Sequence, residues 1–493
     1  MGMLLFTILF VLFLSIFVII FMVYLGYNQK KIQRFSLNVS IVCFYISIFF
    51  WIFFDTSCSD YQYLLRINFW NISTLHSFVN HICFGIDGIS LFFILLTTFL
   101  IPLCLLTTFK INFIKISEFC LYFIVLEIIL IFSFISIDLI CFFYFFESIL
   151  IPMFFIIGIW GSRDRRVWAA FYFFLYTLFG SVFLFFSVLV IYYDIGITSF
   201  YLISKVSIDF NKQVILWLFL YLAFSVKIPT IPMHLWLCEA HVESPTAGSV
   251  ILAGLLLKLG GYAFLRIILP VFSKATIYFL PLVDTLALIS IIYASLTTIR
   301  QVDMKRIIAY SSIAHMNLVV LGIFSNNIQG ISGSIFLMLA HGIVSSALFF
   351  LIGILYDKYY TRIILYYGGL VQTMPLFSFF LLVFCLANIG LPGSCNFIGE
   401  LVIFIGLVER NFVVCIISVT GVVFSVIYTM FFFNRLVFGN LNLSFIFEYQ
   451  DLLKREFYIL CLCLFLTIYL GIIPNIVFNT IYMSVSVCID GLF

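Results

Sequence analysis

The sequence has very little charge. Asp, Glu, Lys and Arg make up 9% of its 493 residues, whereas hydrophobic residues make up 65% and the mean hydropathy is +1.26. A soluble globular domain carries about a quarter charged and about half apolar residues. The composition therefore excludes a soluble globule. Apolar runs of about 20 residues follow one another with short polar joints, which predicts helices that span a membrane.

The sequence also lacks the motifs that bind metals and cofactors. Its 13 cysteines are scattered without a CxxC pair, so no disulfide framework, iron–sulfur cluster or zinc site is expected. It has neither a GxGxxG motif after a strand nor an HExxH motif. The alternating segments of about ten residues that form a membrane β-barrel are missing too. We therefore predict an all-α, polytopic membrane protein that binds no cofactor, no metal and no nucleic acid.

We predict about fourteen transmembrane helices. Their approximate ranges are 3–25, 36–54, 84–108, 117–137, 139–158, 168–193, 214–240, 246–269, 275–298, 305–325, 328–356, 375–408, 411–434 and 457–482. This division separates the basic residues into two unequal sets, as expected when positive loops face one side of the membrane.

One side receives sixteen of the 24 lysines and arginines, and the other receives six. The larger set is Lys30, Lys31, Arg34, Lys110, Lys115, Arg163, Arg165, Arg166, Arg300, Lys305, Arg306, Lys358, Arg362, Arg435, Lys454 and Arg455. The smaller set is Arg66, Lys205, Lys212, Arg266, Lys274 and Arg410. A wrong count of spans would mix the two sets, so their separation supports fourteen spans. With fourteen spans, both termini are predicted on the less positive side.

Ionisable side chains nevertheless fall within or beside the predicted spans. They are Glu127, Asp138, Glu147, Lys227, Lys258, Glu400, His234, His241, His315 and His341. A charged side chain at mid-bilayer costs about 2.5–3.5 kcal/mol, so those that persist face a partner or a wet path. For any one histidine, a structural hydrogen bond between helices is the simpler explanation. Six buried acids and lysines in one bundle favour a functional path.

Glu147 and the buried lysines suggest what this path carries. Glu147 lies among aromatic residues in "CFFYFFESILIPM" and needs a cation, for which Lys227 and Lys258 are the candidates. Burial disfavours the charged form of a lysine, and a neighbouring carboxylate favours it. A lysine whose charge depends on such a neighbour can alternately hold and release a proton, which is the chemistry of a proton pump.

Two predicted spans are interrupted by Pro or Gly. Pro229 and Pro232 break the seventh span, whereas Gly390, Pro392 and Gly393 break the twelfth, just before a glutamate. Irregular backbone at membrane depth is tolerated where it is buried in protein or lines water. Interrupted spans in both halves indicate inverted repeats around an ion site. We predict two inverted five-helix repeats, spans 4–8 and 9–13, each with one broken helix.

The repeats divide the chain into four parts. Residues 1–116 hold helices 1–3, and residues 117–270 form the first antiporter-like repeat. Residues 271–437 form the second repeat, and residues 438–493 hold the C-terminal helix.

From about Phe84 to Val408, the sequence resembles the antiporter-like, proton-translocating membrane subunits of respiratory NADH:ubiquinone oxidoreductase (complex I), most of all the chain 4 family. The motifs that carry the resemblance are "GIDGISLFFILLT", "FFESILIPMFFIIGIWG", "KIPTIPMHLWLCEAHVESPTAGSVILAGLLLKLGGYAFLR", "RQVDMKRIIAYSSIAHMNLVVLGIF", "LAHGIVSSALFFLIGILYDK" and "LPGSCNFIGELVIFIG". Glu400 favours chain 4, because the sibling chains 2 and 5 usually carry lysine there. The segment 55–83 matches poorly, and its role is open.

The resemblance implies roles for the buried residues. Glu147 would pair with the pumping lysine Lys227, Lys258 would be the connecting lysine, and Glu400 the terminal acid. His234, His315 and His341 would belong to a proton relay. Glu127 and Asp138 would be acids of the polar axis with a less defined role. For His241, Glu239 and Glu243, a structural network and a polar network on the proton-uptake side both stay open.

The resemblance also implies partners and a location. NADH, FMN, iron–sulfur clusters and ubiquinone would bind partner subunits, so this chain would have no redox site of its own. Its neighbours would be other membrane-arm subunits, especially chains 2 and 5. It would lie in the mitochondrial inner membrane, with both termini on the intermembrane-space side. A Mrp-type cation/proton antiporter subunit and a structural scaffold subunit without its own proton path are the alternatives.

Overall fold

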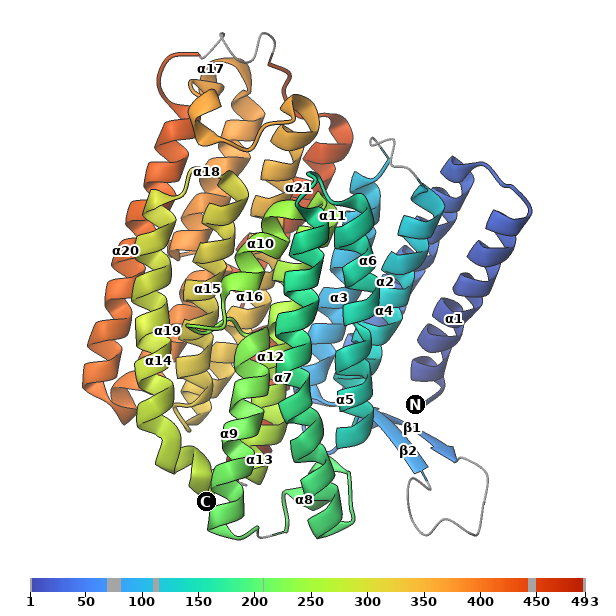
Figure 1. The fold of residues 1–493 in the computed structure, drawn as a ribbon, viewed down its shortest axis with the longest axis vertical. Helices are drawn as coiled ribbons and strands as arrows, with labels where there is room; N and C mark the ends of the chain where they lie inside the picture. The colour runs from blue at the N-terminus through green and yellow to red at the C-terminus, as the bar shows by residue number, and fades with distance from the viewer. Residues whose placement is uncertain (1, 69–80, 110–114, 207, 442–448, 491–493) are drawn as a thin grey trace.

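The computed structural model describes residues 2–68, 81–109, 115–206, 208–441 and 449–490. They form a bundle of helices that run between two ends (Figure 1). The helices are α1 Gly2–Tyr24, α2 Gln29–Ile52, α3 Gly88–Thr107, α4 Ile116–Ile135, α5 Leu139–Ser148, α6 Leu150–Trp160, α7 Arg166–Ile195, α8 Phe200–Ile203, α9 Phe210–Lys227, α10 Leu235–Glu243, α11 Thr246–Ile251, η1 Leu252–Leu256, α12 Leu257–Ala263, η2 Phe264–Ile268, α13 Leu269–Val271, α14 Ser273–Arg300, α15 Met304–Ile323, α16 Ile328–Tyr359, η3 Ile364–Tyr366, α17 Leu370–Thr373, α18 Pro375–Ile389, α19 Cys395–Arg410, α20 Phe412–Val437, α21 Lys454–Ile472 and α22 Asn475–Asp490.

The helical membrane fold predicted from composition is confirmed. Within the described ranges, 12 helices are long and apolar enough to cross a membrane, and two shorter apolar helices are Pro375–Ile389 and Asn475–Ile489. The number fourteen and the inverted repeats stay predictions. The chain is not entirely helical, because strands β1 Gln62–Asn68 and β2 His81–Ile86 form an antiparallel hairpin. The hairpin occupies part of the segment 55–83, and residues 69–80 lie outside the described ones.

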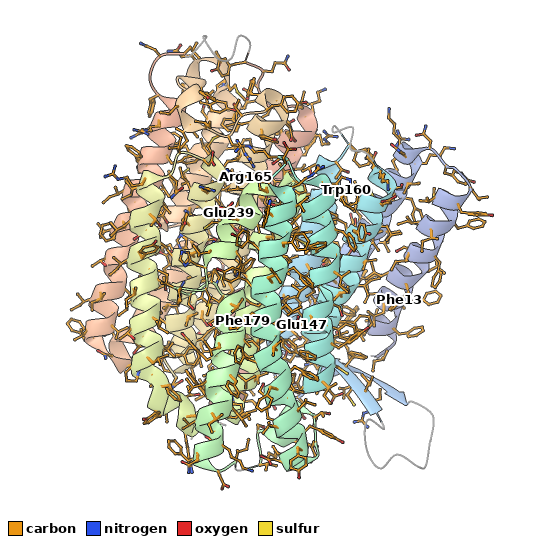
Figure 2. All side chains as sticks on the ribbon, viewed as in Figure 1. Phe13, Glu147, Trp160, Arg165, Phe179 and Glu239 are labelled. Atoms are coloured by element: carbon orange, nitrogen blue, oxygen red, sulfur yellow. The ribbon has the colours of Figure 1, made fainter. Side chains whose placement is uncertain are left out.

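The two ends of the bundle differ in charge. We call the end with α17 the upper end, and both chain termini lie toward the other, lower end (Figure 1). The joint before α2 and the joint between α6 and α7, which carry basic residues of the larger set, lie at the upper end. Arg165 is labelled there (Figure 2). Lys110 of the same set lies outside the described residues. These basic residues of the larger set therefore lie together at one end of the bundle.

Both predicted interruptions are present. The chain leaves α9 at Lys227 and resumes as α10 at Leu235, and it leaves α18 at Ile389 and resumes as α19 at Cys395. Gly390 has φ +86, a left-handed conformation that residues with a side chain rarely adopt. The structure adds a break that the sequence did not predict, because the last predicted span is divided between α21 and α22.

The span 246–271 also departs from a regular helix. It contains two π-helical segments, η1 before Lys258 and η2 after it. A π-helical segment lacks the regular i→i−4 hydrogen bonds and often occurs at functional sites. Because the whole span is buried inside the bundle, irregular backbone here is surrounded by protein, as membrane depth requires.

Two basic residues that were counted on the more positive side are buried. Arg362 is 0% exposed and donates to the carbonyl oxygen of Val242 and, at 3.2 Å, to Oγ of Ser162. Its Nη2 lies 3.6 Å from Oε1 of Glu243. Lys305, 1% exposed, donates from Nζ to the carbonyl oxygen of Ser244 at 2.8 Å. The joints at the upper end are therefore fixed by buried charge rather than by open loops.

Replacing Arg362 with methionine is expected to destabilise the upper end by about 3–5 kcal/mol, because Glu243 is left buried and uncompensated. The double variant Arg362→Met, Glu243→Gln is expected to recover most of the loss, since it removes both charges. The thermal midpoint of the assembled complex, followed by native gel, measures both variants. Equal midpoints for the single and double variants would contradict this role of the pair.

Candidate functional site

The broken span α9/α10 places Lys227 at membrane depth. Lys227 is the last residue of α9 and is 3% exposed. Free carbonyl groups at a helix C-terminus favour a cation there. Nε1 of Trp236 donates to the carbonyl oxygen of Val226 at 2.8 Å, and Nδ2 of Asn317 donates to that of Pro229 at 3.2 Å. These two bonds fix the unwound segment and hence the position of the lysine.

Glu147 lies near the end of α5, inside the bundle (Figure 2). The carboxyl group lies within electrostatic reach of Lys227, but its Oε1 has no hydrogen-bond partner among the described residues. Nζ of Lys227 lies 4.4 Å from the centre of the Phe146 ring and has no hydrogen-bond partner among the described residues. Ser181 of α7 lies within hydrogen-bond reach of the glutamate. Glu147 and Lys227 are therefore near each other without a direct bond, so the distance between their charged groups can change.

Lys258 lies on the irregular span, fully buried between helices. Its Nζ donates to the carbonyl oxygen of Ala253 in η1 and lies at hydrogen-bond distance, 2.8 Å, from Nδ1 of His341 on α16. Thus the π-helical turn supplies one partner and a neighbouring helix the other. Among the described residues, no hydrogen bond joins Lys227 to Lys258.

From His341 the polar contacts continue to the second broken span. The rings of His341 and His315 are 5.6 Å apart, centre to centre. Nδ1 of His315 lies 3.3 Å from Oε1 of Glu400, in the second turn of α19. Glu400 is 5% exposed. We call Lys258, His341, His315 and Glu400 the central line, because they form a continuous row of ionisable groups through the bundle.

Three residues predicted for the site lie away from the central line. His234 lies beside the rings of Tyr293 and Tyr310, 5.7 and 6.2 Å away. Asp138 precedes α5, and its Oδ2 accepts a hydrogen bond from the backbone N–H of Cys83 in the hairpin at 3.1 Å. Burial raises the pKa of Asp138. Glu127 is buried in α4, which packs against α1, α2 and α3.

His241 connects the central line with the upper end. It is fully buried, its ring stacks 4.8 Å from that of Phe349, and neither ring nitrogen has a partner among the described residues. It lies within electrostatic reach of both Lys258 and Lys305. Lys305 in turn lines a cavity of about 650 Å³ together with Ser244. His241 is therefore a buried histidine within electrostatic reach of the central line, and its role stays open at this point.

Lys305 and Asn317 were not recognised as site residues from the sequence. Lys305 ends the motif "RQVDMK" and begins the predicted span 305–325, but it was counted only among the basic residues of the larger set, and Asn317 lies within that span. The signal that could have found Asn317 is a polar amide within an apolar helix, because such a group needs a buried partner.

Changing Asn317 to leucine is expected to weaken the unwound segment. The carbonyl group of Pro229 would lose its donor, and an unsatisfied buried polar group costs about 1–3 kcal/mol. Lys227 would shift with the segment, so we expect lower proton pumping per electron in an assembled complex. The control is Asn411→Ala, at the start of α20, where the side chain caps the helix. Equal pumping by Asn317→Leu and the wild type would show that the bond to Pro229 does not position the lysine.

The comparison with protein families matches residues 136–427 to the model described as NADH:quinone oxidoreductase/Mrp antiporter, TM. NADH-ubiquinone oxidoreductase chain 4 of Marchantia polymorpha is 48% identical over 457 residues, which cover 93% of this chain and 91% of the relative. The chain belongs to the chain 4 family. Chain 4 of Chondrus crispus is 47% identical over the same number of residues.

The motifs resembled the chain 4 family from about Phe84 to Val408. The alignment with the Marchantia polymorpha relative is longer and covers 93% of this chain. Solved structures agree in fold. A chain of respiratory complex I from Thermus thermophilus has a TM-score of 0.87 at 24% identity and covers 99% of this chain and 100% of its own length. A chain of the archaeal membrane-bound sulfane sulfur reductase has a TM-score of 0.84 at 20% identity.

Within the described residues, no group of three or more His, Cys, Asp or Glu could hold a metal ion.

Proposed function

We propose that this chain 4 family member translocates protons in the membrane arm of NADH:ubiquinone oxidoreductase, while partner subunits oxidise NADH and reduce quinone. The observation that carries the proposal is the central line. Four ionisable groups from α12, α16, α15 and α19 follow one another inside a bundle whose buried side chains are mostly apolar. Such a row is costly to bury, and it supplies consecutive sites for a proton.

Glu147 and Lys227 control the first step. While the carboxylate is near, it favours the charged form of the lysine. When the two separate, the lysine holds its proton less firmly and releases it toward Lys258 through water, since no side chain joins the two lysines. From Lys258 the proton passes through His341 and His315 to Glu400. A hydrogen-bonded histidine can accept a proton on one nitrogen and release one from the other.

Protons reach the buried row from the upper end. The cavity lined by Lys305 and Ser244 opens there, and His241 lies within electrostatic reach of both this lysine and Lys258. A histidine with two unpartnered nitrogens is suited to bind water on both sides. We therefore assign His241 to proton uptake, with Glu243 and Arg362 holding the surrounding backbone in place.

The wider assignment follows from the family. The more basic upper end faces the mitochondrial matrix, and both termini lie on the intermembrane-space side of the inner membrane. The antiporter-like chains 2 and 5 are the neighbours, and all redox cofactors belong to other subunits. Residues 117–270 and 271–437 are the two repeats, preceded by helices 1–3 in 1–116 and followed by 438–493. His234, Glu127 and Asp138 lie outside the route of the central line.

Replacing Lys258 with methionine tests the proposal. In proteoliposomes that contain the assembled complex, we expect NADH-driven proton pumping to fall more than about ten-fold, equivalent to about 1.4 kcal/mol in barrier height. Lys274→Met, an exposed lysine at the start of α14, is the matched control and should pump normally. Unchanged pumping by Lys258→Met would favour the structural scaffold. Pumping that stops when sodium is removed would favour the Mrp-type antiporter.

A further inference from the structure

Glu127 is a buried acid that the central line does not use. It is 0% exposed in the middle of α4, and neither carboxyl oxygen has a hydrogen-bond partner among the described residues. An isolated buried carboxylate is very costly, whereas a neutral acid or one reached by water is tolerated. Packing by itself does not explain a glutamate at this position. An apolar residue of similar size would fill the same space without the cost of burying an unpartnered carboxyl group.

The buried side of α2 carries a row of polar residues beside Ile32, Val39 and Phe50. Its buried residues include Gln33, Ser36, Ser40, Cys43 and Ser47. They are three or four positions apart and thus lie on one side of the helix. The opposite side carries exposed apolar side chains such as Val42, Tyr45 and Phe49. The polar side therefore points into the bundle and the apolar side outward. We call these five residues the α2 polar face.

Contacts place the α2 polar face against α3 and α4. At the upper end, Nε2 of Gln33 donates to the carbonyl oxygen of Thr108 at 3.5 Å. Ser36 lies within hydrogen-bond reach of Cys120 on α4. Oγ of Ser47 lies 2.7 Å from Oγ1 of Thr98 on α3. At 1.5 Å per residue, the face extends about 21 Å along α2, most of the depth of the apolar core.

Glu127 adjoins this face. Cys43, in the middle of the α2 polar face, lies within electrostatic reach of the carboxyl group. Helices α1, α3 and α6 contribute no Asp, Glu, Lys, Arg or His, and α5 contributes Glu147. The charged residues of α2 are Lys30, Lys31 and Arg34, which are exposed at its upper end. Among the described residues, no cation is therefore placed to neutralise the acid, and a proton has to do so.

We propose that Glu127 is a second proton-binding site of this chain, reached from the upper end along the α2 polar face. Its carboxylate takes a proton from hydronium in water that enters beside Gln33, forming an O–H bond and leaving a water molecule. It returns the proton to water by the reverse step. This site rests on the proposed proton translocation, but it is separate from the central line in position and in the helices that form it.

Infrared difference spectroscopy of the whole complex, with and without NADH turnover, tests the site. The wild type is expected to show a change in the carbonyl stretch of a protonated carboxylic acid, with a shift in D2O. Glu127→Gln should lose this band. Glu118→Gln, on the same helix, removes a half-exposed acid that lies 3.4 Å from Lys115 and should keep it. If the glutamine variant does not assemble, Glu127→Asp should move the band to another frequency.

The proposal is overturned if the spectra of Glu127→Gln, or of Glu127→Asp, equal that of the wild type, because the acid is then a static neutral group. Lys258→Met separates this outcome from a failure of the central line. If pumping is lost in Lys258→Met while Glu127→Gln leaves the spectrum unchanged, the central line stands and the second site does not. If Lys258→Met pumps normally, the central line falls, whatever the Glu127 band does.

Discussion

Replacing Lys227 with alanine is expected to abolish proton pumping in a complex that still assembles. Lys227 is buried at the end of α9, and its charged form depends on Glu147 and on the carbonyl groups at the helix C-terminus. Without it, Glu147 faces no lysine and the first transfer toward Lys258 has no donor. Electron transfer should fall together with pumping, because the two are coupled. Proton pumping and quinone reduction in membrane vesicles, with assembly checked on a native gel, measure the effect.

The control for this variant lies on the same helix. Lys212, in the first turn of α9, forms an exposed ion pair with Asp194 at 2.9 Å. Such surface pairs contribute about 0–1 kcal/mol, so Lys212→Ala should assemble and pump as the wild type does. Unchanged pumping per electron in Lys227→Ala would make this lysine a structural polar group and would favour the scaffold function.

Changing Gly399 to alanine is expected to separate α19 from α16. A Cβ atom at this position would lie 2.8 Å from Cβ, 2.9 Å from Cα and 3.0 Å from the backbone nitrogen of Leu337. The backbone of α16 cannot rotate away as a side chain can, and overpacking of this kind costs about 1–3 kcal/mol. Glu400 is the next residue, so its 3.3 Å contact with His315 should be lost.

Both assembly and pumping report on this change. We expect less assembled complex on a native gel, and lower proton pumping per electron in the part that assembles. In Gly158→Ala, the added Cβ would meet Cβ of Ala170 at 3.8 Å, an ordinary contact, and both quantities should stay normal. Normal assembly and pumping in Gly399→Ala would show that the two helices can move apart without affecting the central line.

The sequence by itself determined the membrane class, the two broken spans and the ionisable residues worth attention. Backbone groups in lipid must be paired, which only helices and closed barrels achieve, and the long apolar runs without alternation leave the helical bundle. Pro229, Pro232 and Gly390 mark interruptions because they remove donors or permit left-handed backbone. Lys227, Lys258 and Glu400 were singled out by the free-energy cost of placing a charged side chain inside the bilayer.

Only the tertiary structure decided which of these residues meet. Lys258 lies 83 positions from His341, and nothing local predicts that their side chains are 2.8 Å apart. The structure also placed Asp138 beside the hairpin and buried Arg362, which the sequence assigned to a loop. In a membrane both lipid and protein are apolar, so hydrophobic pattern does not choose the facing sides of helices. The facing sides are chosen instead where two helix backbones approach closely, as at Gly399. Such an approach depends on residues far away in the sequence.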